Sequence, residues 1–289
     1  MIYEGDVYRP PSEANSLIIQ LTIGCAHNTC TFCTMYKKDK FRIRKTEEVI
    51  EDLHWVKRHY PYYFDRVFLA DGDALIVKTP ELITILDTIR ELFPHVRRVT
   101  TYGAARDVLH KRPDELALLR QHGLEMVYIG AESGSDKVLS NVNKGVTAAE
   151  TIEACLKLKA AGIKTSMTLI TGLGGKADTR EHAIESAKLV SAAKPEYLGL
   201  LTLTLGGDSQ LKKDHLAGKF ETLTPLEDLE EQKLFLENVD SEGTVLRSNH
   251  ISNYFALSGT LNQDREKMIA QLGSAIERAR AIPELCRRL

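Results

Sequence analysis

Short apolar runs rich in β-branched residues alternate with longer segments of helical period along most of the chain. Apolar runs of this length favour strands, and apolar residues recurring every three or four positions favour helices. The predicted strands are Leu17–Ile23, Arg66–Ala70, Arg97–Tyr102, Met126–Ala131, Ile163–Thr171 and Tyr197–Thr204. The helices predicted between them are Thr46–His59, Pro80–Phe93, Pro113–Gln121, Ala148–Ala161 and Thr179–Ala193. This alternation is typical of a parallel sheet built from βα units.

Six βα units between residues 16 and 205 are too few for a closed eight-fold barrel. They favour an α/β fold with a partial (β/α)6 barrel, or else a doubly wound sheet. After Leu205 the alternation stops, and the remaining pattern predicts helices near Pro225–Asn238 and Gln263–Ile282. We therefore divide the chain into a lead-in (1–15), a core barrel (16–205) and a C-terminal helical extension (206–289) that covers the barrel mouth.

Composition narrows the class of protein. The chain has 289 residues, 43% of them hydrophobic, which is enough for one large domain with a core of its own. A net charge of −2 argues against a dedicated nucleic-acid-binding domain. The apolar runs are too short to cross a bilayer, and no secretory signal is recognisable. We therefore expect a cytoplasmic protein, where clustered cysteines more often bind metal or do redox chemistry than form disulfides.

Three of the five cysteines lie in the stretch GCAHNTCTFCTMY, residues 24–36, directly after the first predicted strand. Cys25, Cys30 and Cys33 have the spacing C-x4-C-x2-C. A disulfide does not suit the compartment, and a nucleophilic cysteine does not need two neighbouring thiols. A zinc site needs a fourth ligand, for which His27 is available. Thiolates also hold iron–sulfur clusters, and three of them leave one iron of a cubane without a protein ligand.

A three-cysteine loop after the first strand of a partial βα barrel resembles the radical S-adenosylmethionine (radical SAM) superfamily. The resemblance implies that Cys25, Cys30 and Cys33 hold a [4Fe–4S] cluster whose fourth iron binds the amino and carboxylate groups of SAM. The commonest family spacing is C-x3-C-x2-C, so this chain has one extra residue in the first gap. Phe32 matches the family's aromatic position, which implies packing near the adenine or shielding of the cluster.

The second predicted strand ends in Asp71-Gly72-Asp73, which resembles the Gly-Gly-Glu motif of the family. The resemblance implies that Gly72 and Asp73 receive the SAM ammonium group. A glycine beside an acid lets both backbone and carboxylate approach a cation closely. The alternative is an ordinary Asp-Gly turn.

The segment GAESGSDKVL, residues 130–139, is followed by NKG at 143–145. It resembles a motif of one branch of the superfamily, which includes the tRNA methylthiotransferases and relatives of anaerobic coproporphyrinogen oxidase. The resemblance implies that Glu132 accepts hydrogen bonds from the ribose or methionine part of SAM, assisted by Ser133. Alternatively, Ser135 and Asp136 form an N-cap for the short helix that follows.

The fifth predicted strand ends in LITGLGG, residues 169–175, which resembles the hydrophobic–Gly-x-x-Gly element of the family. The resemblance implies that Thr171 and Gly172 lie against the adenine, with Leu201 on the sixth strand as a further neighbour. A purely structural turn is the alternative.

The resemblance implies a radical SAM oxidoreductase, which cleaves SAM reductively to methionine and a 5′-deoxyadenosyl radical that takes a hydrogen atom from a small-molecule substrate. Candidate substrate contacts are Tyr102, at the end of the third predicted strand, and Arg247 and His250 in the polar segment 247–254. A polar surface loop is the alternative for that segment. Two other hypotheses remain: a non-catalytic iron–sulfur or zinc protein, and a SAM-dependent group-transfer enzyme.

The basic run 37–45 is suited to dock an acidic flavodoxin or ferredoxin that supplies the electron, although a solvated face is the simpler interpretation. Cys155 and Cys286 lie too far apart in sequence for a second cubane, which disfavours dual-cluster enzymes. No cobalamin-binding or added RNA-binding domain is recognisable. We expect a monomer or homodimer without a membrane partner.

Overall fold

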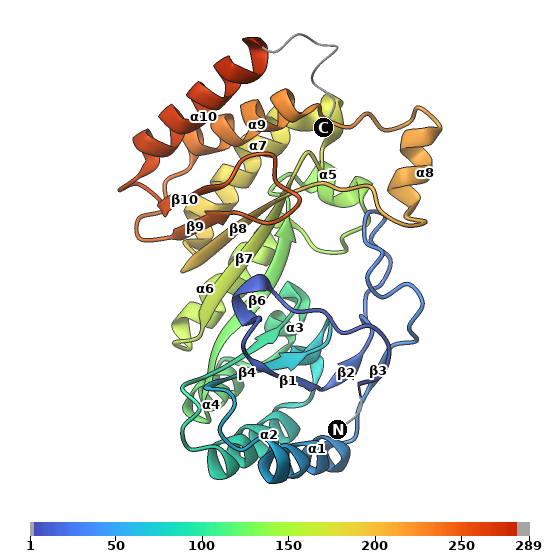
Figure 1. Cartoon of the computed structure of the whole chain (residues 1–289), viewed down its shortest axis with the longest axis vertical. Coiled ribbons are helices and arrows are strands. Elements are labelled where there is room, and N and C mark those ends of the chain that lie inside the picture. The colour runs from blue at the N-terminus through green and yellow to red at the C-terminus, as the bar shows by residue number, and fades with distance from the viewer. Residues whose placement is uncertain (1–2, 282–289) are drawn as a thin grey trace. The chain divides into compact units, whose positions relative to one another are not determined.

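The computed structural model describes residues 3–281 and has an α/β fold with a mostly parallel eight-stranded sheet (Figure 1). The strands of this sheet are β1 (Leu17–Gln20), β4 (Arg66–Ala70), β5 (Arg98–Tyr102), β6 (Leu124–Glu132), β7 (Lys164–Thr171), β8 (Tyr197–Thr202), β9 (Val245–Ser248) and β10 (Leu257–Thr260). A separate small sheet pairs β2 (Thr22–Ile23) with β3 (Arg42–Ile43).

The helices follow the strands along the chain, as the sequence pattern predicts. They are α1 (Thr46–His59), α2 (Thr79–Leu92), α3 (Ala105–His110), α4 (Pro113–Gln121), α5 (Asp136–Asn141), α6 (Ala148–Ala160), α7 (Gly175–Ala193), α8 (Gln210–Leu216), α9 (Pro225–Asn238) and α10 (Arg265–Ala281). Two short 3₁₀ turns, η1 (Pro11–Glu13) and η2 (Ala74–Ile76), complete the set. The predicted bounds of α1, α4, α9 and β4 are confirmed to the residue.

The chain divides into two compact units. Unit 1 comprises Met1–Thr29, Cys33–Ile129 and Glu153–Thr165, and unit 2 comprises Cys30–Phe32, Gly130–Ile152 and Ser166–Leu289. Strands β1, β4, β5 and the part of β6 up to Ile129 lie in that order in unit 1, joined by parallel pairs. In unit 2, β7 pairs parallel with β8 and β8 with β9, whereas β10 is antiparallel to β9.

In unit 1, α1 packs against both α2 and β1 (Figure 1). Val49, Leu53 and Val56 recur at helical spacing and form the buried face of α1. On the strands, Phe68 is fully buried and its ring packs edge-on against Tyr102, with centroids 4.9 Å apart. Burial of this surface removes apolar area from water, which is the main favourable contribution to folding.

In unit 2, α9 packs against both α7 and α10, and the three helices lie side by side (Figure 1). A second apolar cluster joins α5, the turn after β7, and α8; its buried members are Val138, Val142, Leu173 and Leu211. The cluster therefore connects the ends of several βα units within unit 2.

Other element ends differ from the prediction by one or two residues, and the short helices α3 and α8 were not predicted. Three further differences have a physical explanation. The first predicted strand divides at Leu21, because Thr22 and Ile23 pair with β3, a partner that local sequence does not reveal. Helix α7 begins at Gly175 rather than Thr179, since the amide of Lys176 finds an acceptor in the carbonyl of Glu221 at 2.9 Å. The extension after residue 205 contains β9 and β10 as well as helices, because β9 extends the sheet alongside β8. Ile282, the predicted end of the last helix, lies outside the described residues.

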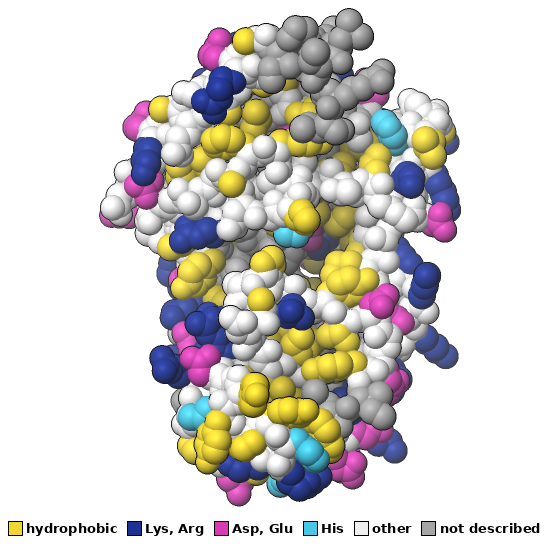
Figure 2. Space-filling view, in the orientation of Figure 1, with side chains coloured by type: hydrophobic (Ala, Val, Ile, Leu, Met, Phe, Trp, Pro, Cys, Tyr) yellow, Lys and Arg dark blue, Asp and Glu magenta, His cyan; other side chains and the backbone are white. Residues whose placement is uncertain are grey.

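Acidic and basic side chains are interspersed over the face seen in Figure 2, in keeping with the net charge of −2. No large field of one sign dominates this face, which is ordinary for a globular protein.

Gly134, in the turn before α5, provides a test of packing within unit 2. A Cβ atom there would lie 2.2 Å from the carbonyl oxygen of Glu185, so the turn meets the α7 backbone directly. We expect Gly134→Ala to lower the free energy of unfolding by about 1–3 kcal/mol, measured by urea denaturation.

Gly273→Ala is the matched control. Gly273 lies inside α10, and nothing approaches its Cβ position within 4 Å. Because alanine favours a helix interior over glycine, this variant should gain about 0.5–1 kcal/mol. Equal effects of the two substitutions would contradict the packing interpretation.

Candidate functional site

The three cysteines lie in the segment between β2 and β3. Cys25 and Cys33 are partly exposed and belong to unit 1, whereas Cys30 is buried and belongs to unit 2. Asn28, whose φ of 41° is left-handed, donates from Nδ2 to the carbonyl of Tyr36 at 2.8 Å. The Nζ of Lys37 donates to the carbonyl of Asn28 at 2.7 Å. Polar groups of unit 1 therefore fix the middle of this loop.

Within the described part of the chain, no three His, Cys, Asp or Glu side chains are arranged to hold a metal ion. The donor chemistry is nevertheless that of an iron–sulfur site, because three thiols lie within residues 25–33 and two of them are accessible to solvent. Ligation by Cys25, Cys30 and Cys33 stays a prediction. Cys155 is buried in α6, and Cys286 lies outside the described residues.

The predicted ammonium-binding motif directly follows β4. Asp71 is fully buried, and it accepts hydrogen bonds from the hydroxyl of Tyr36 at 2.5 Å, from Gln20 Nε2 at 3.3 Å and from the amide of Tyr8 at 3.5 Å. Burial raises the pKa of Asp71 to about 6, although these hydrogen bonds oppose the shift.

Asp73, the acid that the sequence selects, is also fully buried and pairs with Arg106 at 2.9 Å. Asp107 lies beside it, and burial together with Asp73 raises the pKa of Asp107 to about 8. Asp73 Oδ1 has no hydrogen-bond donor among the described residues while Asp107 is ionised. Two buried carboxylates thus face one guanidinium, so the pair either shares a proton or attracts a second cation.

In unit 2, Glu132 ends β6 with a left-handed φ of 66°. Its Oε1 lies 2.8 Å from Nζ of Lys144, which comes from the NKG part of the same motif. A Cβ on Gly130 would fall 2.2 Å from that carboxylate oxygen, so the glycine leaves room for it. The ion pair with Lys144 therefore holds the Glu132 side chain in place. The contact of Glu132 with SAM stays a prediction.

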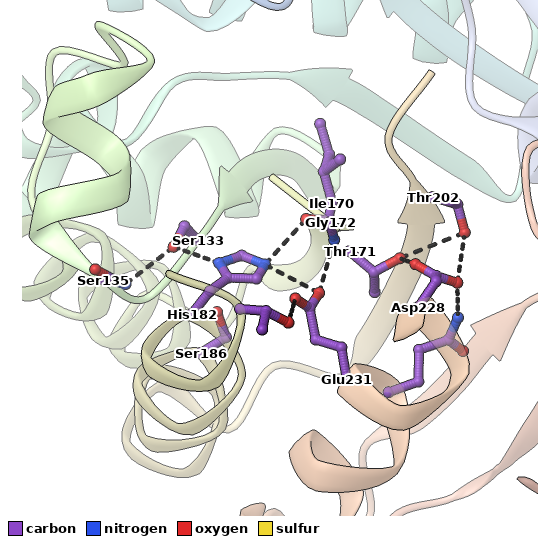
Figure 3. Close-up of polar contacts among 12 residues, drawn as sticks. Ser133, Ser135, Ile170, Thr171, Gly172, His182, Ser186, Thr202, Asp228 and Glu231 are labelled. Carbon is purple, nitrogen blue, oxygen red and sulfur yellow. Dashed lines mark hydrogen bonds and ion pairs between the residues drawn. The ribbon is translucent and has the colours of Figure 1, made fainter. Parts of the chain in front are cut away.

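Ser133 is fully buried and bonded on two sides (Figure 3). Its Oγ lies 2.8 Å from Nδ1 of His182 and accepts from the amide of Ser135 at 3.0 Å. Burial lowers the pKa of His182 to about 4, so this histidine is neutral. With Nε2 donating to the carbonyl of Ile170 at 3.0 Å, Nδ1 is left to accept from Ser133. The motif is thereby tied to α7 and to the end of β7.

Two carboxylates of α9 meet the ends of β7 and β8 (Figure 3). Asp228 accepts from the hydroxyls of Thr171 at 2.5 Å and Thr202 at 3.2 Å, and from Gln232 Nε2 at 2.8 Å. Burial raises the pKa of Asp228 despite these donors.

Glu231 accepts from the amide of Gly172 at 2.7 Å and from the hydroxyl of Thr179 (Figure 3). Burial raises its pKa to about 7. Sequence reasoning missed Asp228 and Glu231 because their partners are far away in the chain. Their spacing of three residues, which places both on one face of a helix, was the available signal.

A pocket of about 400 Å³ opens in unit 2 at these strand ends. Thr171, Gly172 and Asp228 line it, together with Ser252 and Tyr254 of the polar segment 247–254. A pocket of this size is within the usual range for small-molecule sites.

The candidate substrate residues have different surroundings. Tyr102 of unit 1 packs among Phe68 and Tyr128, and burial raises its pKa. Arg247 of unit 2 is exposed on β9, where it donates to the carbonyl of Leu246 at 2.8 Å. His250 has Nδ1 2.8 Å from the hydroxyl of Ser252. Neither Arg247 nor His250 lines the pocket of unit 2.

Phe32 and Leu201, both predicted to lie near adenine, belong to unit 2. Phe32 packs against the apolar cluster of Val138 and Leu211, and the preceding Thr31 donates its amide to Val142 at 2.9 Å. Leu201 is half-buried on β8. Their adenine contacts stay predictions.

Within residues 3–281, every helix is too short or too polar to span a membrane.

Comparisons with known proteins place these features in a family. Residues 19–190, more than half of the chain, match the Radical SAM superfamily. Threonylcarbamoyladenosine tRNA methylthiotransferase MtaB of Rickettsia prowazekii is 24% identical over 186 residues, covering 62% of this chain and 43% of that protein. The 4′-phospho-dehydrooxetanocin synthase of Priestia megaterium is 25% identical over 228 residues, covering 71% of this chain and 31% of that protein. The chain thus spans less than half the length of these curated relatives.

Among solved structures, methylornithine synthase (PylB) is similar in fold, with a TM-score of 0.55 and 16% identity. The similarity covers 93% of this chain and 82% of PylB. Together with the family match, it identifies the parallel sheet as the partial barrel predicted from the sequence. The chain belongs to the radical SAM superfamily, and this membership implies a [4Fe–4S] cluster and S-adenosylmethionine as its cofactors.

Proposed function

We propose that this chain is a radical SAM enzyme acting on a small-molecule substrate in the cytoplasm. When bound, the cluster and SAM supply a 5′-deoxyadenosyl radical that abstracts a hydrogen atom. The observation that carries the proposal is the three-cysteine loop, which directly follows β2 inside the matched segment 19–190. The role of the protein is to bind, orient and shield these groups.

Cys25, Cys30 and Cys33 are the proposed cluster ligands. The partial exposure of Cys25 and Cys33 supports this assignment, because iron must reach the thiols and an external reductant must reach the cluster. The docking surface for a flavodoxin or ferredoxin is proposed at residues 37–45. Arg42 and Arg44 already pair with Glu4 and Asp52, so the lysines of this run would supply the docking charge.

We assign the SAM ammonium group to the Gly72–Asp73 end of β4. Asp73 and Asp107 carry two negative charges against the single charge of Arg106 when both are ionised. A second cation removes the need for a shared proton, which favours an ammonium group there. The buried Oδ1 of Asp73 is its proposed acceptor.

The ribose and adenine are assigned to unit 2, with Glu132, Ser133, Thr171, Gly172, Leu201 and Phe32 as the proposed contacts. The positive φ of Gly172, 77°, supports close approach of a ligand to this turn. Tyr102, Arg247 and His250 remain the proposed substrate contacts, with Tyr102 in unit 1 and the other two in unit 2.

Air-free reconstitution tests the cluster and the reaction. With iron, sulfide, dithionite and SAM, we expect 5′-deoxyadenosine as a product, detected by chromatography and mass spectrometry. Cys25→Ala should lose both bound iron and product, because a cluster ligand is removed. Cys155→Ala, which removes a thiol on α6, should keep both.

The proposal is wrong if the reconstituted protein binds only zinc, or if the Cys25→Ala variant retains its iron. Label transferred from the methyl or aminocarboxypropyl group of SAM to an acceptor, without 5′-deoxyadenosine, would indicate group transfer instead.

Asp73→Asn tests the ammonium assignment. Loss of a hydrogen bond between charged groups costs about 1.5–3 kcal/mol, so the Kd for SAM should rise roughly 10- to 100-fold. Asp114→Asn is the control, since Asp114 pairs with Arg112 at 3.0 Å and both side chains are exposed. Calorimetry of both variants should separate them, and an unchanged Kd in Asp73→Asn would refute the assignment.

The same site predicts a pH dependence of SAM binding. Because the pKa of Asp107 is raised to about 8, the acid pair holds a proton at neutral pH that a bound ammonium would displace. Affinity should therefore rise with pH towards 8 and level off above it. Asp107→Asn should remove this slope. Calorimetry in buffers of different ionisation enthalpy measures the released proton directly, and binding without proton release contradicts the prediction.

A further inference from the structure

We propose that Tyr36 is a positioning residue, whose hydrogen bond to Asp71 holds the cysteine loop in register with the end of β4. This inference rests on the proposed function, because it concerns how the cluster loop and the ammonium site of SAM are kept in their relative places. Tyr36 ends the cysteine stretch 24–36 and Asp71 begins the Asp71-Gly72-Asp73 motif, but the family resemblance gives neither residue a role.

The side chain of Tyr36 joins the two segments directly. Tyr36 follows Cys33 by three residues and is only 4% exposed. Its hydroxyl donates to Asp71 Oδ1 at 2.5 Å, and Asp71 is the residue that follows β4. A Cβ on Gly72 would lie 2.6 Å from a ring carbon of Tyr36. The ring therefore occupies the space that a Cβ at position 72 would need, which explains the glycine there independently of any ligand.

The backbone of Tyr36 holds the other side of the loop. Its carbonyl accepts from Asn28 Nδ2 at 2.8 Å and from the amide of Asp39 at 3.1 Å. Asn28 lies between Cys25 and Cys30, so one residue connects the middle of the cysteine loop to the strand end. Without the hydroxyl contact, the loop would keep its internal bonds and lose this connection.

Asp71 is itself held from two further segments, both in unit 1. Gln20, the last residue of β1, donates from Nε2 to Asp71 Oδ2 at 3.3 Å. The amide of Tyr8 donates to Oδ1 at 3.5 Å, and the Tyr8 ring meets that of Tyr36 edge-on with centroids 5.2 Å apart. These contacts hold the Asp71 carboxylate in place, so its hydrogen bond with Tyr36 can position the cysteine loop.

Tyr36→Phe removes the hydroxyl and keeps the ring. Tyr128→Phe is the matched control, because Tyr128 is similarly buried and donates to Glu13 at 2.6 Å, also in unit 1. Its hydroxyl also lies 2.8 Å from that of Ser12. Both variants lose one buried hydrogen bond to a carboxylate and should lose similar stability. Only Tyr36→Phe should loosen the cysteine loop.

The first readout needs no cofactor. The first test alkylates metal-free protein with iodoacetamide. Cys25 and Cys33 should react on the order of 10-fold faster in Tyr36→Phe than in the wild-type protein, because the variant loses one charge-assisted hydrogen bond. Cys155, which is 1% exposed, reports global opening within the same molecules and should not change relative to Tyr128→Phe. Peptide mass spectrometry resolves the three sites.

The second readout uses the reconstituted protein. In Tyr36→Phe we expect the KM for SAM to rise more than kcat falls, because the missing bond alters the binding geometry and no reacting group. Alkylation rates and KM equal to those of Tyr128→Phe would overturn this inference. Failure of the proposed function is distinguishable, since wild-type protein would then bind no iron and form no 5′-deoxyadenosine.

Discussion

An ionised carboxylate cannot be buried without donors, and this constraint governs the carboxyl ends of the parallel strands. Asp71 and Asp73 at β4, Glu132 at β6, and Asp228 and Glu231 facing β7 and β8 are all at most 9% exposed. Each one has a hydrogen-bond donor or a cation beside it, because desolvation would otherwise cost several kcal/mol per charge. The polar architecture of both units follows from satisfying these acids.

The two units meet this constraint differently. In unit 2, threonine hydroxyls, the side-chain amide of Gln232 and the backbone amide of Gly172 donate hydrogen bonds to the acids that face β7 and β8. In unit 1, Asp73 and Asp107 share one arginine and remain short of positive charge. The excess negative charge of Asp73 and Asp107 is suited to a cationic ligand. The hydrogen-bonded acids of α9 are suited instead to keep the strand ends of unit 2 rigid.

The sequence predicted the strands and helices well wherever local signals were sufficient. Proline and acidic residues at the start of α4, and glycine just beyond its end, fixed its bounds. Strand β3 and the sheet strands of the extension were missed because their formation depends on partners far away in the chain. The same reason hid Tyr36, Asp71, Asp228 and Glu231: neither a motif nor a period shows which donor meets which acid. Motif resemblance selected Asp73 and Glu132, but their ion pairs with Arg106 and Lys144 follow only from the fold.

The attachment of α9 has a consequence for protein engineering. The family match ends at residue 190, yet Asp228 and Glu231 accept hydrogen bonds from the Thr171 hydroxyl and the Gly172 amide at the end of β7. A barrel excised at the family boundary would leave these groups facing solvent or one another. Chimeras that transplant this barrel between relatives must therefore carry α9 along, or supply two equivalent acceptors from the new host.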